Sequence, residues 1–339
     1  MAHGELIEMM NYHSFLEGAG PDSLGPDSAG GSQPGFAVAA INSTGSYISP
    51  VAQVLSQLAK WIALFALALG RGGLGSDVMD ARKISNLEGG LAAFYTLGKG
   101  DSFGSSVVAL GDINGDGITD LAVGAYGDDD GGNYAGAVYV LFMNVTVIGA
   151  QKISNDYGGL SAFYTLDSGD AFGASLAALG DWDGDGIPDM AVGAYGDDDG
   201  ADYNAGAVYI IFLNSDGTVK AMHKISNSHG NLASFYTLGS DDSFGGSIAA
   251  IGDLDSDGVA DLAVGAYRDD DGTSGTWGDS DAGALYILFM TANATVGGAQ
   301  KISNSEGGFA AHYTLASRDY FGISVASIDL NSDGVSELV

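Results

Sequence analysis

Asp181-Trp182-Asp183-Gly184-Asp185-Gly186-Ile187-Pro188-Asp189 is the stretch of this sequence from which the fold can be worked out. It places carboxylates at its positions 1, 3, 5 and 9 and a glycine at position 6. Alternate residues of an extended segment point the same way, so we expect these side chains to converge. Converging anions repel one another unless a cation lies among them, and a flexible cluster of oxygen ligands suits Ca²⁺. The stretch therefore predicts a calcium loop, in which glycine supplies a sharp turn and position 7 offers its backbone carbonyl.

The same loop occurs four times, which makes a chance acidic turn a poor explanation. One Ca²⁺ is expected for each complete repeat, and the fourth loop, which ends two residues before Val339, is the least expected to bind. The predicted metal ligands are, copy by copy, Asp112, Asn114, Asp116, Ile118 and Asp120; Asp181, Asp183, Asp185, Ile187 and Asp189; Asp253, Asp255, Asp257, Val259 and Asp261; and Asp329, Asn331, Asp333, Val335 and Glu337.

A helix–loop–helix calcium site also begins with D-x-D-x-D-G, but it requires a bidentate Glu at position 12 and a helix on each side. Position 12 is Val123, Val192 or Val264 in the three complete copies. The flanking residues are rich in Val, Ala and Leu and too few for helices, which is typical of strands. The helical version of the site is therefore rejected.

The loops belong to a tandem repeat of about 70 residues. Lys-Ile-Ser-Asn begins at residues 83, 152, 224 and 301, and Phe-Gly begins at residues 103, 172, 244 and 321. We therefore divide residues 81–339 into three complete repeats and one incomplete repeat. Their predicted bounds are 83–151, 152–223, 224–300 and 301–339.

Each repeat is predicted to form four strands. In the third strand of the second repeat, Val208, Ile210 and Phe212 would face one way while Tyr209 and Ile211 face the other. Both faces are apolar, so the sheet must be covered on both sides. Four-stranded sheets stacked face to face around an axis meet that demand, which favours a β-propeller over a linear solenoid. The strands predicted in this repeat are 172–179, 190–194, 206–213 and one around 223–226.

Phe-Gly, the acidic loop and the following Ala-Val-Gly-Ala-Tyr together resemble the FG-GAP repeat over about three-quarters of the chain. That repeat builds the propellers of integrin α-chains and of many bacterial and algal surface proteins. The resemblance implies an all-β fold of four-stranded antiparallel blades that forms part of a seven-bladed propeller, with calcium at the loop positions given above. Tyr126, Tyr195 and Tyr267 stand where the family has proline, and we expect them to alter loop packing but not the fold.

The charge and the cysteine content limit the possible partners. Asp and Glu total 43 against 11 Lys and Arg, which gives a formal net charge of −32. Nucleic-acid binding requires a basic footprint, so neither a nucleic acid nor an anionic membrane surface is expected as a partner. There is no cysteine, so the fold has no disulfide framework, and calcium could take the stabilising role. The oligomeric state is left open.

Two segments precede the repeats. Residues 1–50 are rich in Gly, Pro and Ser, so we expect a disordered arm. In residues 51–70, apolar residues recur at three- and four-residue spacing, which predicts a helix. The segment is either an amphipathic helix or a signal or anchor, since its apolar run is too short to span a bilayer.

A second acidic tract follows each complete loop, at 128–130, 197–199 and 269–271. It could add an outer ion site or form a solvated turn. No nucleophile elbow, phosphate loop or zinc motif is present. Because paired carboxylates recur in every repeat, they fit structural metal sites better than one active site, and we expect no enzyme.

The sequence thus predicts a calcium-binding adhesion module at the cell surface or outside the cell, with an extracellular protein or glycan as its ligand. The N-x-S/T sequons at Asn42, Asn144 and Asn293 are consistent with a secreted glycoprotein. The alternative function is a non-catalytic accessory or carbohydrate-binding module of a larger secreted enzyme.

Overall fold

The computed structural model describes residues 81–199, 202–270, 281–328 and 337–339. All of these residues belong to one unit, Gly35–Val339. The arm predicted at 1–50 and the helix predicted at 51–70 lie outside the described residues, so both stay predictions.

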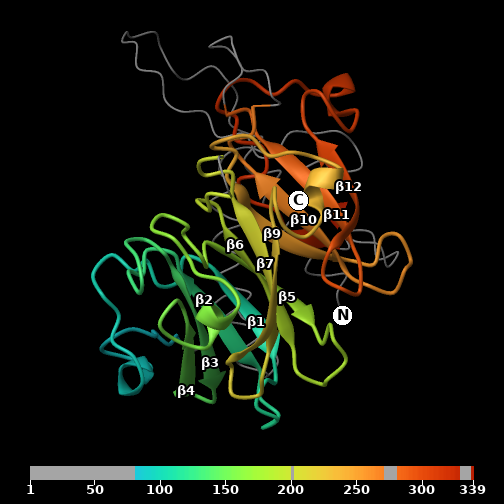
Figure 1. Ribbon diagram of the computed structural model, residues 1–339. Helices are drawn as coiled ribbons and strands as arrows, with labels where there is room; N and C mark the ends of the chain where they lie inside the picture. The colour runs from blue at the N-terminus through green and yellow to red at the C-terminus, as the bar shows by residue number, and fades with distance from the viewer. Residues whose placement is uncertain (1–80, 200–201, 271–280, 329–336) are drawn as a thin grey trace, which may run out of the picture. The chain divides into compact units, whose positions relative to one another are not determined.

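Each complete repeat forms a four-stranded antiparallel sheet, which we call a blade, and its strands are paired in sequence order (Figure 1). The described residues form no α-helix, only single-turn 3₁₀ segments, so the all-β prediction is confirmed. The first blade contains β1 (Val107–Gly111), β2 (Asp120–Ala125), β3 (Ala137–Met143) and β4 (Val147–Ile153). The second contains β5 (Ser175–Gly180), β6 (Asp189–Ala194), β7 (Ala207–Leu213) and β8 (Val219–Ile225). The third contains β9 (Phe244–Gly252), β10 (Asp261–Ala266), β11 (Ala284–Met290) and β12 (Val296–Ile302).

The fourth repeat is described only in part. Its strands β13 (Ser327–Ile328) and β14 (Glu337–Leu338) form a short antiparallel pair. The 3₁₀ segments η2 (Leu91–Ala93), η3 (Leu160–Ala162), η4 (Leu232–Ser234) and η5 (Phe309–Ala311) occupy the same place in the four repeats. The period read from the sequence is therefore the period of the structure.

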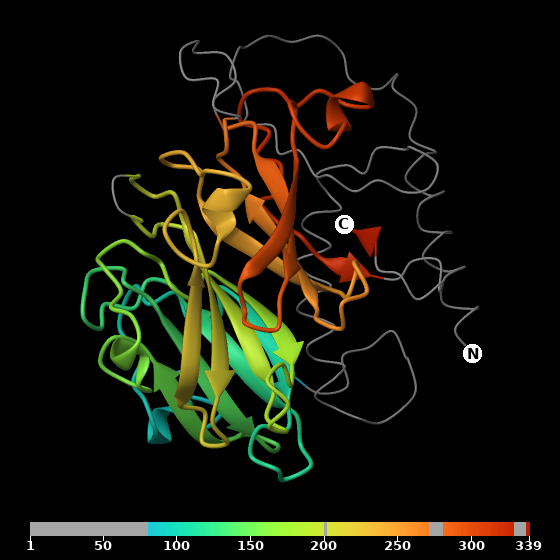
Figure 2. The same ribbon diagram turned by 45° about the vertical axis from the view of Figure 1, so that its right-hand side comes forward.

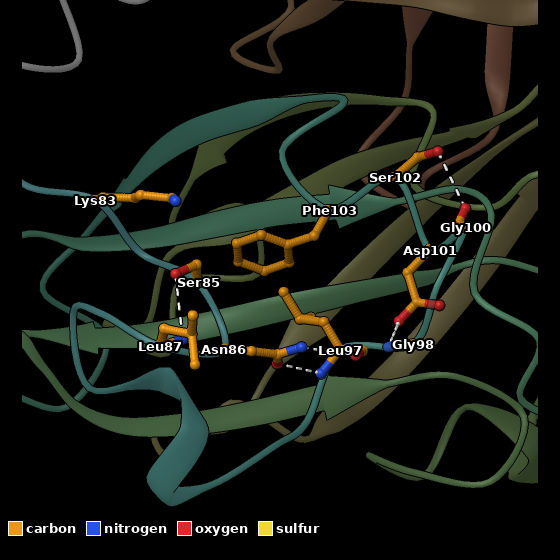
Figure 3. Close-up of a pocket in the computed structure, with 10 residues that line it drawn as sticks. All are labelled: Lys83, Ser85, Asn86, Leu87, Leu97, Gly98, Gly100, Asp101, Ser102 and Phe103. Atoms are coloured by element: carbon orange, nitrogen blue, oxygen red, sulfur yellow. Dashed lines mark hydrogen bonds between the residues drawn. The ribbon is translucent and has the colours of Figure 1, made fainter.

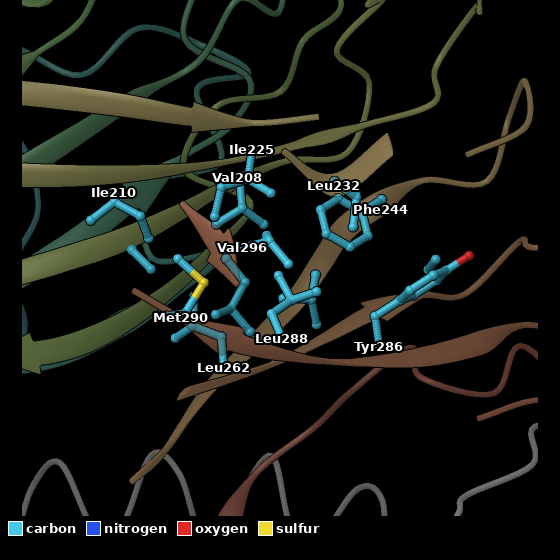
Figure 4. Packing of buried hydrophobic residues seen from close by; sticks show 14 of the residues in the cluster. Val208, Ile210, Ile225, Leu232, Phe244, Leu262, Tyr286, Leu288, Met290 and Val296 are labelled. Atoms are coloured by element: carbon cyan, nitrogen blue, oxygen red, sulfur yellow. The ribbon is translucent and has the colours of Figure 1, made fainter. Parts of the chain in front are cut away.

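Strand β7 is buried along its whole length, and its two faces enter two different cores. Val208 and Ile210 pack with Leu262 and Leu288 of the third blade (Figure 4). On the opposite face, Tyr209 packs with apolar residues of the first blade. The prediction that both faces of this strand are covered is confirmed, and the covering layers are the neighbouring blades.

The Phe-Gly motif joins one blade to the next. The first strands of successive blades lie side by side, β1 beside β5 and β5 beside β9 (Figures 1 and 2). Phe172 forms a parallel bridge with Gly136, which precedes β3 of the first blade, and the same bridge recurs one blade later between Gly206 and Phe244. Ser106 Oγ of the first blade donates to the carbonyl of Gly173 at 2.7 Å. The motif is therefore an inter-blade joint.

Glycine is required where the blades approach most closely. A Cβ on Gly193 of β6 would lie 2.0 Å from the carbonyl oxygen of Gly245, and Gly124 meets Gly173 in the same way at 1.9 Å. Real Cβ atoms do not come this close to backbone, so the glycine of Ala-Val-Gly-Ala permits the contact between blades.

The Lys-Ile-Ser-Asn motif closes the loop that precedes each Phe-Gly. In the first repeat, Asn86 Nδ2 donates to the Leu97 carbonyl at 2.8 Å, and Asn86 Oδ1 accepts from the Leu97 amide at 2.6 Å (Figure 3). The pairs Asn155–Leu166, Asn227–Leu238 and Asn304–Leu315 repeat both bonds. Each motif asparagine therefore fixes a loop eleven residues further along the chain.

Candidate metal centres

The three complete acidic loops join the first strand of each blade to the second: β1 to β2, β5 to β6 and β9 to β10. Their position-6 glycines, Gly117, Gly186 and Gly258, have φ of 84°, 89° and 91°. Only glycine adopts this backbone conformation readily, so the predicted sharp turn is present in every complete copy.

The position-1 aspartate organises each loop by accepting backbone N–H groups. Asp112 accepts from the amide of Asp116 at 2.9 Å and from that of Gly117 at 2.8 Å. Asp253 accepts from Asp257 at 3.0 Å and Gly258 at 2.9 Å. Each carboxylate oxygen has a second lone pair, so these bonds leave capacity for a cation.

The position-9 aspartate is buried and ties its loop to the body of the blade. Asp189 is 1% exposed; its Oδ2 accepts from the amide of Trp182 at 2.9 Å and its Oδ1 from that of Leu213, the last residue of β7, at 3.1 Å. The other two loops repeat both bonds. Asp120 accepts from the amides of Ile113 and Met143, and Asp261 accepts from those of Leu254 and Met290. Burial raises the pKa of Asp189 to about 6, and it also raises the pKa of Asp120 and Asp261 above the usual range.

In two of the described loops, three carboxylates gather closely enough to contact one ion. In the second loop, one oxygen each from Asp181, Asp183 and Asp185 lies within 4.8 Å of the others. In the third loop, Asp253, Asp255 and Asp261 gather within the same distance.

The first loop has an amide at position 3, and there the Nδ2 of Asn114 donates to Asp116 at 3.1 Å. Of the fourth predicted site, Asp329, Asn331, Asp333 and Val335 lie outside the described residues. Glu337 lies in β14.

The donor set of these loops fits a hard cation. It consists of carboxylate, amide and backbone oxygens without sulfur or imidazole, and Ca²⁺ accepts six to eight such oxygens in variable geometry. The position-7 residues are also held in place, because the amides of Ile118, Ile187 and Val259 each donate to the position-5 aspartate at 2.8 Å. If Ca²⁺ binds, the residues that would hold it are the loop positions predicted from the sequence.

Lys220 of β8 also reaches the second loop, which the sequence did not indicate. Its Nζ lies 2.7 Å from Asp183 Oδ2 and 2.6 Å from Asp185 Oδ2. The hydrogen bonds to Asp183 and Asp185 raise the pKa of the Lys220 ammonium above its ordinary value. An ammonium ion thus contacts two of the predicted calcium ligands.

The first aspartate of each second acidic tract is buried and forms an ion pair with a lysine. Asp128, Asp197 and Asp269 are each 2% exposed, so the solvated-turn interpretation is wrong for the first acid of each tract. Asp197 accepts from Lys224 Nζ at 2.7 Å and from the Tyr209 hydroxyl at 2.6 Å. Lys152 with Tyr139 and Lys301 with Tyr286 repeat this arrangement.

This buried lysine is the first residue of Lys-Ile-Ser-Asn. The motif begins at the end of the fourth strand of each blade, which we call the outer strand. Its lysine therefore reaches the acidic tract that follows the blade's second strand. The co-occurrence of this lysine and the tract in every complete repeat was the signal that could have predicted the pair. The second acids, such as Asp129 and Asp198, are exposed.

A further buried carboxyl lies beside each of these pairs. Asp170, just before Phe-Gly, is 4% exposed, and its Oδ2 accepts from the Asp167 amide at 2.8 Å. Burial, together with the negative charge of Asp197, raises the pKa of Asp170 to about 7. Burial raises the pKa of Asp101 and Asp242 in the same direction.

The tyrosines that replace the family's proline, Tyr126, Tyr195 and Tyr267, form a row that runs from blade to blade, and Tyr320, which precedes the fourth Phe-Gly, extends it. The ring centroids of Tyr126 and Tyr195 are 6.4 Å apart, those of Tyr195 and Tyr267 6.3 Å, and those of Tyr267 and Tyr320 6.1 Å. All four residues are partly exposed. The blades form as expected in the presence of these tyrosines, and their effect on loop packing stays a prediction.

A surface pocket of about 340 Å³ lies against the first blade and is lined by residues of the segment 83–103 (Figure 3). Lys83 and Asp101 are the titratable side chains among its lining residues, and Asp101 is already bound to the Gly98 amide at 2.6 Å.

Comparison with known protein families identifies the repeat. The FG-GAP repeat model matches residues 103–141, 172–211 and 244–288, each of which runs from the Phe-Gly motif into the third strand of a complete blade.

Among curated proteins, integrin alpha-3 of Cricetulus griseus is 34% identical over 208 residues, which is 61% of this chain and 17% of that protein. Integrin alpha-PS5 of Drosophila melanogaster is 34% identical over 182 residues, or 52% of this chain and 16% of that protein. Integrin alpha-7 of Homo sapiens is 36% identical over 169 residues, which is 49% of this chain and 12% of that protein. The chain thus spans about a sixth or less of the length of these relatives. Within the described part of the chain, no helix has the length and apolar character needed to cross a membrane.

Proposed function

Because the chain is built of FG-GAP repeats and is similar to integrin α-chains, we propose that it is a calcium-stabilised, non-enzymatic interaction module that acts at the cell surface or outside the cell. The observation that carries the proposal is the repeated role of the position-9 aspartate. In each complete blade this buried carboxylate contacts its own acidic loop and the end of the third strand. An ion bound by the loop would therefore be coupled directly to the core of the blade.

Calcium would act by relieving repulsion among carboxylates that the fold forces together. In the third loop, one carboxylate oxygen each of Asp253, Asp255 and Asp261 lies within 4.8 Å of the others. The whole chain has a formal net charge of −32, which adds to the repulsion. Because an unfolded loop has no preformed site, the free energy of calcium binding would stabilise the folded state.

Calorimetric titration of the full chain with Ca²⁺ tests this part of the proposal. We expect saturable binding at the three complete loops, with dissociation constants on the order of 10⁻⁴ to 10⁻³ M, as in other extracellular modules. Such sites would fill in an extracellular fluid and stay empty in the cytosol. No saturable binding, or equal binding of Mg²⁺ and Ca²⁺, would contradict it.

The interaction role rests on the similarity to integrin α-chains and is supported by the tyrosine row. Tyrosine is enriched at protein interfaces because it offers a large, rigid contact area together with a polar hydroxyl. Across successive blades, four residues are partly exposed: Tyr126, Tyr195, Tyr267 and Tyr320. We propose that an extracellular protein binds over this row. Alanine substitution of Tyr195 should weaken cell attachment to the immobilised full chain; unchanged attachment would argue against this surface.

Exposure of two sequons supports an extracellular location. Asn144 lies in the turn between β3 and β4, and Asn293 lies in the turn between β11 and β12. Both side chains are exposed, so a glycan could be attached without disturbing a blade. Asn42 lies outside the described residues. Mass measurement before and after enzymatic release of N-glycans, on protein from a secreting eukaryotic host, tests whether these sites are modified.

The alternative function, a carbohydrate-binding or accessory module of a secreted enzyme, is favoured by one observation. Tyr134 and Tyr203, beside the acidic tracts of the first two blades, are 47% and 63% exposed, and such rings can stack on sugars. A glycan array probed with and without chelator separates the two functions. Calcium-dependent glycan binding that is lost in Tyr203→Ala would favour the alternative.

A further inference from the structure

Lys220 distinguishes the second acidic loop from the other two complete loops. The fourth strand of each complete blade begins with a valine whose amide donates to the carbonyl of a glycine at the same position in each repeat. The bonds are Val147 to Gly89 at 2.9 Å, Val219 to Gly158 at 2.9 Å and Val296 to Gly230 at 2.8 Å. The residue that follows this valine is Ile148 in the first blade, Lys220 in the second and Gly297 in the third. A lysine at this point is therefore particular to the second blade.

The contacts of Lys220 place its ammonium among the loop oxygens that a metal ion would use. Asp183 Oδ1 and Asp185 Oδ1 accept from amides of the loop itself, those of Asp185 and Ile187. The other oxygen of each carboxylate, Oδ2, lies 2.7 or 2.6 Å from Lys220 Nζ. The Oδ2 atoms of Asp183 and Asp185 therefore both point to the position that the Lys220 ammonium occupies.

The third loop provides the comparison. Asp253, Asp255 and Asp257 make the corresponding contacts to loop amides, but within the described part of the chain no lysine or arginine forms an ion pair with them. The side chains of Lys220, Asp183 and Asp185 are 37%, 28% and 27% exposed, so the second loop's ion pair is in contact with solvent and can exchange.

We propose that Lys220 is a tethered cation that occupies the second acidic loop when no metal ion is bound and must leave before Ca²⁺ can bind there. This inference rests on the proposed binding of calcium by the loops. An ammonium ion and Ca²⁺ repel each other and require the same oxygens, so the two cannot share Asp183 and Asp185. The second loop therefore binds calcium more weakly than the third, and it keeps its shape when calcium is withdrawn.

Trp182 makes the second loop separately observable. It is position 2 of that loop, and its ring packs against the core shared by the second and third blades. Tb³⁺ takes oxygen ligands as Ca²⁺ does, and its luminescence is excited through a nearby tryptophan. The full chain is titrated with Tb³⁺ under excitation that tryptophan absorbs and tyrosine does not, and bound Tb³⁺ is then displaced with Ca²⁺. Trp182→Phe identifies the signal that arises from this loop.

The test compares the wild type with Lys220→Gln, which removes the cation, and Lys220→Arg, which keeps it. For Lys220→Gln we expect Ca²⁺ affinity at the Trp182-reported loop to rise by roughly three- to tenfold, the range for breaking two partly exposed charge pairs. Lys220→Arg should stay close to the wild type. In chelator, Lys220→Gln should melt at a lower temperature than Lys220→Arg, because its loop carboxylates have lost their cation.

The outcomes separate this inference from the proposed function. If the wild type binds Ca²⁺ at the loops and Lys220→Gln does so with unchanged affinity, the tethered-cation role is overturned while the calcium sites stand. If neither protein binds Ca²⁺, both the calcium sites and the competition are overturned. Equal melting of the two variants in chelator would separately overturn the role of Lys220 in the metal-free loop.

Discussion

At the scale of single residues, Asp170 couples the stability of the second blade to pH. Its folded-state pKa is about 7, raised by burial and by Asp197, whereas the ordinary value is 3.8. The folded protein therefore favours the protonated carboxyl. The stabilisation is fully present below about pH 4 and is lost as the pH rises through about 7.

Asp170→Asn should remove this dependence. Asparagine is neutral at every pH, and its Oδ1 can accept from the Asp167 amide in place of the carboxylate. We expect the variant to match the wild type near pH 4 and to exceed its unfolding free energy by about 2–4 kcal/mol near pH 8. Urea unfolding across this pH range measures the difference. The exposed Asp156→Asn is the control, and an Asp170→Asn profile parallel to the wild type would refute the assignment.

Gly193→Ala should destabilise the joint between the second and third blades. The new methyl would lie 2.0 Å from the Gly245 carbonyl oxygen, so the two backbones would have to separate. Overpacking of this kind costs about 1–3 kcal/mol or more. Gly298→Ala is the matched control, because its Cβ would meet the Phe289 side chain at 3.3 Å. Equal denaturant midpoints for the two variants would show that the joint tolerates a side chain.

Repetition decided which residues could be predicted from the sequence. The turn glycines and the acidic residues that we predict as ligands were visible because three or four copies agree, and the asparagine and lysine of Lys-Ile-Ser-Asn carried a similar signal. Lys220 has no counterpart in the other blades, and its partners, Asp183 and Asp185, lie more than thirty residues away. A contact that occurs once and depends on the pairing of two strands leaves no pattern in the sequence.

At the scale of elements, strands buried on both faces were predicted best. The predicted third strand, 206–213, agrees with β7, since its apolar residues are continuous. The outer strand β8 begins at Val219, although the sequence indicated only residues near 223–226. Lys220 and His223 interrupt its apolar pattern, and its extent is set by pairing with β7 through the turn after Leu213.

Two substitutions in the third blade separate the structural role of the acidic loop from its proposed metal-binding role. Asp261→Ala leaves the amides of Leu254 and Met290 without their acceptor, so it should cost about 2–4 kcal/mol even in chelator. Asp257→Ala removes an exposed side chain that we propose as a ligand, so it should change stability little in chelator while reducing the stabilisation by Ca²⁺.

Urea unfolding of both variants, with chelator and with excess Ca²⁺, makes the comparison. Two variants of equal stability in chelator would mean that Asp261 does not tie the loop to β11.

At the scale of the whole molecule, each blade is completed by its neighbours. One core joins the first blade to the second, and another joins the second to the third. The parallel bridges at Phe172, Phe244 and Phe321 connect the same neighbours, and the last of these leads into the fourth repeat. The free energy of unfolding of such an array is approximately the sum of the stabilities of its blades and of the interfaces between them. A substitution that destabilises one loop should therefore also lower the stability of the adjacent blades. The sequence predicted this stacking from the two apolar faces of one strand.

Calcium stabilisation of the blades is the central claim, and thermal unfolding of the full chain tests it most directly. The melting temperature is measured with excess Ca²⁺, with Mg²⁺ and with chelator, all at one ionic strength because the net charge of −32 makes the fold sensitive to screening. At a free Ca²⁺ concentration about 100 times the dissociation constant, each filled loop adds about 2.7 kcal/mol. We predict a rise of at least about 5 °C with Ca²⁺ and a much smaller one with Mg²⁺. Identical melting curves under the three conditions would contradict the account.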